Sequence, residues 1–105
     1  MQEETKTLSI TQKLESRTLY VTLKGWLDPN TSPTLTSELN LTDIDHLEID
    51  MAQVEYVFSA GLRAFLQLKR TLDINGADMV LKNTSPSIRS IFEYTGLESM
   101  LDKDK

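Results

Sequence analysis

The sequence predicts an α/β domain built on a mostly parallel sheet. Two stretches with alternating apolar residues come first, at residues 8–14 and 19–23, and indicate two strands. Helical and strand patterns then alternate to the end of the chain, which favours right-handed crossovers between parallel strands. With 105 residues the chain has room for a single hydrophobic core, so we expect one domain over residues 1–105.

The first two strands are expected to form an antiparallel hairpin. Leu8, Ile10 and Leu14 share one phase of the alternation, and residues 19–23 repeat that pattern after a polar turn at 15–17. We expect Gly25 to end the second strand. Residues 28–33 are rich in residue types that cap helices or break strands, so a helix is predicted from Ser32 or Pro33 to residue 39.

The central part of the chain reads as strand, tight loop and helix. A third strand is predicted through residues 47–51, and Val54, Val57 and Phe58 lead from it into the loop. Ser59 stands where a helix would have its N-cap, and Gly61 would let the backbone pass close to another surface. Apolar residues then recur at helical spacing as far as residues 72–74, and the sequence Asn-Gly at 75–76 predicts the end of this helix.

The last third of the chain predicts a short strand and one more helix. Residues 79–81 are continuously apolar, as expected of a strand covered on both faces. The final helix is predicted from Pro86 to Tyr94, with Gly96 as its stop. Residues 102–105 alternate in charge and read as a solvated tail.

Charge and composition exclude several classes of function. The net charge of −5 argues against a nucleic-acid partner, which would need clustered Lys and Arg. The chain has no cysteine, no apolar segment typical of a signal peptide and no apolar run of about 20 residues. We therefore expect a cytoplasmic protein that does not bind membranes.

The sequence shows no constellation typical of an enzyme or a metal site. The one histidine, His46, stands just before a strand, without a nucleophile nearby in the sequence. Asp43, Asp45, Glu48 and Asp50 form a carboxylate-rich run, but in a strand such residues alternate with apolar ones and mostly face water. We expect no catalytic residue, no metal ligand and no cofactor.

Three segments resemble motifs of STAS domains, the family of bacterial anti-sigma factor antagonists. Residues 57–62, VFSAGL, resemble the family's Asp-Ser-Ser/Thr-Gly-Leu loop. Residues 25–35, GWLDPNTSPTL, resemble its Gly-Glu-Leu-Asp-x-x-Thr-Ala-Pro-x-Leu segment, and residues 90–97, SIFEYTGL, are similar to its closing helix. The resemblance implies a four-stranded mixed sheet with helices packed on it as a β-α superhelix.

The resemblance also implies a function and a switch. Such domains bind an anti-sigma factor, often a serine-kinase-like ATPase, and binding releases the sigma factor. The kinase switches the domain off by phosphorylating a Ser or Thr in the loop before the central helix. A phosphate there adds about −2 charge and three acceptor oxygens, which would repel and clash in a packed interface.

Carried over residue by residue, the motif predicts the surface that binds the partner and puts the switch in doubt. The acceptor position is Ala60, which has no hydroxyl, and the family's Asp is Phe58. Ser59 is either an N-cap or turn hydroxyl or a displaced phosphoacceptor. The residues expected to bind the partner are Asp28, Thr31, Phe58, Ser59, Ala60, Gly61, Leu62 and Arg63.

Alternatives stay open from the sequence. The favoured hypothesis is an anti-sigma factor antagonist that lacks the usual off-switch or uses Ser59. The second is a STAS scaffold that serves as an interaction or ligand-sensing module in another pathway, and the third is a small enzyme. Trp26, where the family usually has Glu, is either a partly buried rim residue or an exposed anchor for a partner.

Overall fold

Four strands form one mixed sheet in the order β1-β2-β3-β4 in the computed structural model, which describes residues 7–102. The strands are β1 (Leu8–Glu15), β2 (Thr18–Leu27), β3 (His46–Val57) and β4 (Asp78–Lys82). β1 pairs with β2 in antiparallel register, whereas β2 with β3 and β3 with β4 are parallel. The mixed four-stranded sheet confirms the predicted fold class.

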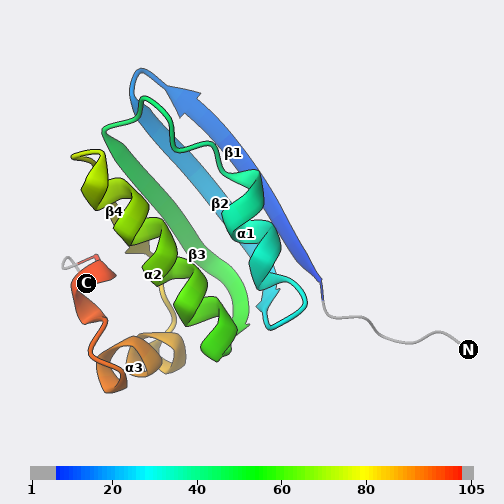
Figure 1. Ribbon diagram of the computed structural model, residues 1–105. Coiled ribbons are helices and arrows are strands. Elements are labelled where there is room, and N and C mark those ends of the chain that lie inside the picture. Colours follow the sequence, from blue (N-terminus) through cyan, green and yellow to red (C-terminus); the bar gives the residue numbers. More distant parts are fainter. Residues whose placement is uncertain (1–6, 103–105) are drawn as a thin grey trace, which may run out of the picture.

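Three helices cover one face of this sheet. They are α1 (Ser32–Glu38), α2 (Ser59–Ile74) and α3 (Pro86–Tyr94), followed by the short 3-10 helix η1 (Glu98–Met100). α1 and α2 lie side by side along the sheet, and α3 lies across its lower end (Figure 1). The opposite face of the sheet carries no helix among the described residues, and there the side chain of Tyr20 on β2 is 40% exposed.

The hydrophobic core lies between the sheet and the helices. Alternate residues of β2 and β3 point into it, such as Leu23 and Ile49, and α2 adds Phe65 and Leu72, all of them fully buried. The ring of Phe65 packs on that of Phe92, with centroids 5.8 Å apart, and this contact holds α3 against α2. The predicted helical spacing of α2 is thus the spacing of its buried face.

The second strand does not end at Gly25, as the sequence had suggested, but continues to Leu27. Gly25 adopts a φ of +118°, which residues with a Cβ rarely adopt, and the register to β3 shifts between Gly25 and Trp26. The N–H of Trp26 then donates to the carbonyl oxygen of Thr7, at 2.9 Å, so β2 stays paired beyond the bulge. Trp26 therefore lies inside a strand.

Two expectations for the last third of the chain are wrong. β4 is an edge strand, and only Leu81 in it is fully buried, because one face of the sheet carries no helix. Asp102 does not belong to a solvated tail as expected, since its N–H donates to the Leu81 carbonyl oxygen at 2.9 Å, next to the parallel bridge between Leu101 and Leu81. Residues 103–105 lie outside the described residues.

Within residues 7–102, no helix is long and apolar enough to cross a membrane.

Candidate partner-binding surface

The two loops singled out by the sequence meet at one end of the sheet. β2 and β3 run parallel and end side by side, with Leu27 paired to Val57. The N–H of Phe58 donates to the carbonyl oxygen of Leu27 at 2.8 Å, which joins the start of α2 to the loop that follows β2. Segments separated by about thirty residues in the sequence thus form one surface, because parallel strands end at the same edge.

Asp28 and Thr31 shape the loop between β2 and α1. The Asp28 carboxylate accepts hydrogen bonds from the N–H groups of Asn30 and Thr31, at 2.9 and 3.0 Å. The Thr31 hydroxyl accepts from the N–H of Asp28 at 3.0 Å and donates to the carbonyl oxygen of Trp26 at 2.6 Å. These bonds fix the loop, so both side chains position it whether or not they also touch a partner.

Gly61 brings α2 against the end of β2, as predicted. Its Cα carries no side chain toward Leu27 and Val57, both of which are almost fully buried. A Cβ built at Gly61 would lie 2.9 Å from Cγ1 of Val57, closer than real Cβ contacts allow. The glycine of the motif is therefore a packing requirement of this corner.

Ser59 is not the N-cap of the central helix. The N-cap is Phe58, whose backbone is extended, and Ser59 is the first residue of α2. Since Phe58 cannot offer a side-chain acceptor, α2 has no side-chain cap, and the Phe58 carbonyl accepts instead from the N–H groups of Gly61 and Leu62. The capping role expected for Ser59 is therefore wrong. Its side chain is exposed and makes no hydrogen bond among the described residues.

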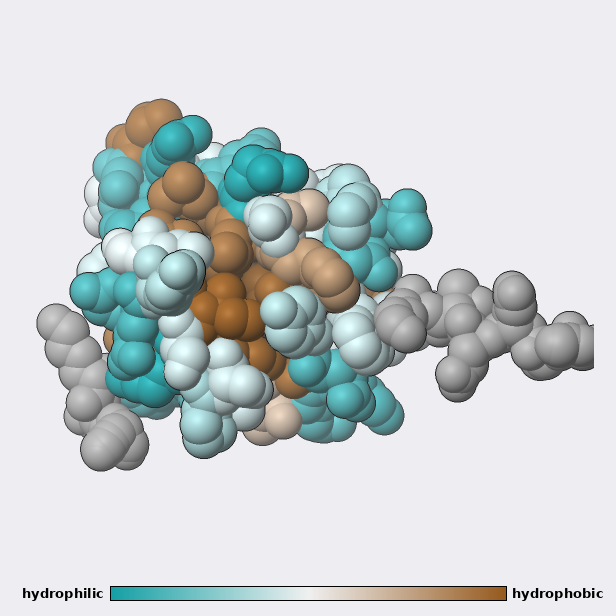
Figure 2. Space-filling view, turned by 90° about the horizontal axis from the view of Figure 1, so that it is seen from below, coloured by the Kyte–Doolittle hydropathy of each residue, from teal (hydrophilic) through white to brown (hydrophobic). Residues whose placement is uncertain are grey.

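Apolar side chains remain partly exposed around the start of α2. Phe58 is 41% exposed, and Ala60 and Leu62 are half-buried. Seen from this end of the molecule, hydrophobic residues gather in the middle of the surface, with more polar ones around them (Figure 2). Such a patch at the end of a helix is typical of a surface that binds another protein.

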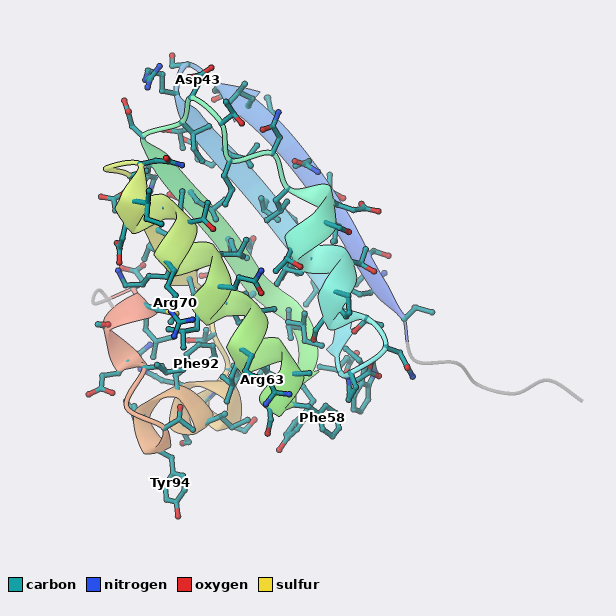
Figure 3. All side chains as sticks on the ribbon, viewed as in Figure 1. Asp43, Phe58, Arg63, Arg70, Phe92 and Tyr94 are labelled. Atoms are coloured by element: carbon teal, nitrogen blue, oxygen red, sulfur yellow. The ribbon has the colours of Figure 1, made fainter. Side chains whose placement is uncertain are left out.

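Arg63 adds a positive charge to the same end. It is exposed, lies near Phe58 (Figure 3) and makes no ion pair within the described residues. The first turn of α2 contains no acidic residue. The surface therefore combines exposed apolar groups with a cation that is available to a carboxylate from outside.

A shallow groove runs between α1 and α2 beside this surface. Pro29, Ser32 and Pro33 line one side of it, and Ala60 and Arg63 line the other. The hydroxyl of Ser32 is buried and is the one buried side-chain oxygen without a hydrogen-bond partner in the described part of the chain. Ser59 does not line the groove.

Tyr56 belongs to this end of the molecule although the sequence did not single it out. Its ring meets the ring of Phe58 edge-on, with centroids 4.7 Å apart, and lies 6.4 Å from the ring of Trp26. The Tyr56 side chain is 39% exposed. Strand alternation extended past Met51 would have placed Tyr56 on the face opposite Val57, the face without helices.

His46 and the carboxylates lie away from this surface, at the other end of β3. His46 contacts Glu48 and Asp78, and Glu48 also lies 3.8 Å from Lys82, so this is a partly exposed cluster of polar side chains. Nearby, the Arg17 guanidinium donates to Asp45 at 3.0 Å, and this hydrogen bond raises the pKa of Arg17. Among residues 7–102, no group of three or more His, Cys, Asp or Glu side chains has the arrangement of a metal site.

The chain belongs to the STAS domain family, whose sequence model matches residues 9–104. This agrees with the mixed sheet, the three helices and the glycine packed at the start of α2.

Relatives of the chain are anti-sigma factor antagonists. The anti-sigma-B factor antagonist of Listeria monocytogenes is 28% identical over 81 residues, which are 74% of this chain and 71% of that protein. The unphosphorylated anti-sigma factor antagonist SpoIIAA superposes with a TM-score of 0.80 at 18% identity, covering 90% of this chain and 86% of the other. An anti-sigma factor antagonist from Mycobacterium paratuberculosis superposes with a TM-score of 0.79 at 21% identity, over 91% and 86% of the two chains. At such identities the superpositions show the shared fold.

Proposed function

We propose that this chain is an anti-sigma factor antagonist that binds an anti-sigma factor through the surface at the start of α2. The observation that carries the proposal is the convergence of both motif loops at one end of the sheet, joined by the hydrogen bond from Phe58 to Leu27. Phe58 and Leu62 there leave apolar surface partly exposed, and Arg63 adds an exposed charge. Binding would occupy the partner surface that otherwise holds the sigma factor, in the cytoplasm as the sequence predicts.

We further propose that phosphorylation does not control this antagonist in the usual way. The position that would accept phosphate is Ala60, in the first turn of α2, and it carries no hydroxyl. Its half-buried methyl group and the neighbouring Phe58 make the loop more apolar, which suits a persistent interface. Ser59 is exposed one residue earlier, so a kinase that accepts this register could reach it.

The proposal predicts binding that a charge at Leu62 abolishes. Each purified anti-sigma factor of the source organism is titrated with the chain, and affinity is measured by calorimetry. Leu62→Asp is expected to weaken binding by about 100-fold or more, because an unpaired carboxylate would be buried at the centre of the interface. Ile74→Asp, at the other end of α2 where the side chain is 84% exposed, is the matched control and is expected to bind like the wild type.

Incubation of the complex with ATP followed by mass spectrometry tests the second part. A chain that stays unmodified and bound supports constitutive antagonism. Phosphate on Ser59, with loss of binding, would show a switch displaced by one residue. If no anti-sigma factor binds the wild-type chain, the proposed function is wrong, and a STAS interaction module outside sigma-factor control takes its place.

A further inference from the structure

Three aromatic rings pack together beside the proposed interface, on the sheet face without helices. We call Trp26, Tyr56 and Phe58 the aromatic cluster. Their ring centroids lie 6.4 Å (Trp26 to Tyr56), 6.3 Å (Trp26 to Phe58) and 4.7 Å (Tyr56 to Phe58) apart. Trp26 stands opposite Tyr56 in the parallel pairing of β2 and β3, and the next pair, Leu27 and Val57, is buried in the core. Alternation therefore turns Trp26 and Tyr56 away from the helices, and the ring of Phe58 at the start of α2 packs on both.

The cluster joins two of the positions where the chain departs from the motifs it resembles. Trp26 stands where that pattern has Glu, and Phe58 stands where it has Asp. The two positions are 32 residues apart in the sequence, yet their rings are in contact in the fold. Two acidic positions have thus become one apolar surface, and Tyr56 extends it.

The geometry favours a macromolecular surface over a small ligand. The rings touch one another, so no space remains between them for a cation or a flat molecule, as an aromatic cage would require. Tyr56 and Phe58 nevertheless keep 39% and 41% of their surface exposed. Exposed, mutually packed rings are the side chains that contribute most at protein interfaces.

The backbone under the cluster is held from both sides. The N–H of Trp26 donates to Thr7 at 2.9 Å, its carbonyl oxygen accepts from the Thr31 hydroxyl at 2.6 Å, and the N–H of Phe58 donates to Leu27 at 2.8 Å. The backbone that carries Trp26 and Phe58 is thus fixed before any partner arrives, which lowers the entropic cost of binding.

We propose that the aromatic cluster extends the partner-binding surface from the start of α2 onto the open face of the sheet. Resting on the proposed function, this inference assigns the chemistry of the partner: an anti-sigma factor that meets the cluster with an apolar surface and places a carboxylate opposite Arg63. Arg63 lies on α2 toward the same end as Phe58 (Figure 3) and makes no ion pair within residues 7–102. A second copy of the chain fits less well, because two molecules of net charge −5 repel each other.

The test uses the fact that Trp26 is the only tryptophan of the chain. The chain is labelled with 5-fluorotryptophan and titrated with the anti-sigma factor that binds it with highest affinity. Fluorine NMR is expected to show a shifted resonance in the complex and a smaller change on exchanging H₂O for D₂O, because the partner covers the indole. Tyr56→Ala is expected to weaken binding about tenfold.

Tyr20→Ala provides the matched control. Tyr20 lies on the same open face, is 40% exposed and stands at the other end of β2, so its loss is expected to change affinity by less than about twofold. One outcome would overturn the cluster's role and keep the proposed function. In it, Leu62→Asp abolishes binding, Tyr56→Ala leaves the affinity unchanged, and the fluorine resonance does not shift in the complex. A resonance that shifts with the concentration of the labelled chain alone would assign the cluster to a second copy. If no anti-sigma factor binds the wild-type chain, both proposals fail together.

Discussion

Gly61 lies so close to Leu27 that a Cβ on the glycine would stand 2.8 Å from Cβ of Leu27 and 3.1 Å from its carbonyl oxygen. The same carbonyl oxygen accepts the hydrogen bond from the N–H of Phe58. The start of α2 is therefore fitted to the end of β2 by both packing and hydrogen bonding. This contact sets where the exposed residues of the loop lie relative to the Asp28 loop.

Gly61→Ala is expected to destabilise the protein by about 1–3 kcal/mol, measured as the free energy of unfolding in urea. In a solvent-exposed helix the same change would stabilise the protein by about 1 kcal/mol through helix propensity. At Gly61 the steric clash is therefore expected to turn this gain of stability into a loss. Ser59→Ala, two residues earlier at an exposed position, is the control and is expected to shift stability by less than about 0.5 kcal/mol. Equal unfolding midpoints for Gly61→Ala and the wild type would show that α2 can move away from β2 freely.

Neighbouring hydroxyls at Thr31 and Ser32 are expected to have opposite effects on stability. Thr31→Val removes the group that accepts from Asp28 and donates to Trp26, and should cost about 1–2 kcal/mol. Ser32→Ala removes a buried oxygen that has no partner within the described residues, so stability should stay the same or rise. Thermal unfolding of the two variants checks this, and a loss on Ser32→Ala as large as that on Thr31→Val would contradict it.

Phe58→Asp is expected to separate stability from binding. An Asp at this N-cap can accept from the free N–H groups of the first turn of α2, a gain of about 1 kcal/mol, while the lost contact with Tyr56 costs a similar amount. The free energy of unfolding should therefore change by less than about 1 kcal/mol. Affinity for the anti-sigma factor should fall by about 100-fold or more, because the carboxylate would be desolvated in the interface. A variant that binds like the wild type in calorimetry would remove Phe58 from the interface.

Gly25→Ala tests the close approach of β2 to Thr7 just before Trp26. Gly25 has a φ of +118°, and a Cβ there would lie 2.1 Å from the carbonyl oxygen of Thr7. The expected loss of stability is about 2–4 kcal/mol. Gly76→Ala, at a φ of +74° with nothing within 4 Å of the added Cβ, carries only the backbone strain and should lose about 1 kcal/mol. Urea denaturation of both variants measures the difference in the free energy of unfolding. Equal losses of stability would mean that the backbone at Thr7 can move away from the added Cβ without destabilising the protein.

The elements of the fold could be read from local patterns in the sequence. The alternation of Leu8 and Ile10 indicates which face of β1 turns toward the core. The helical spacing of Phe65, Leu68 and Leu72 does the same for α2, and the structure buries these three residues almost completely. Local chemistry was less reliable where two rules competed. Gly25 was expected to end a strand and instead lies within it at a positive φ, and the hydroxyl of Ser59 was expected to cap a helix that begins one residue too early for it.

The sequence by itself determined the order of strands and helices, the identity of the two loops and the absence of a hydroxyl at Ala60, because each depends on residues close together in the chain. Only the tertiary structure decided that Trp26, Tyr56 and Phe58 touch. Their contact depends on the register between β2 and β3, which shifts at Thr22/Lys24 and again at Gly25/Trp26 before it sets Trp26 opposite Tyr56. Pairing between distant strands is fixed by the packing of the whole sheet, and a shift of one residue would turn these rings to the other face.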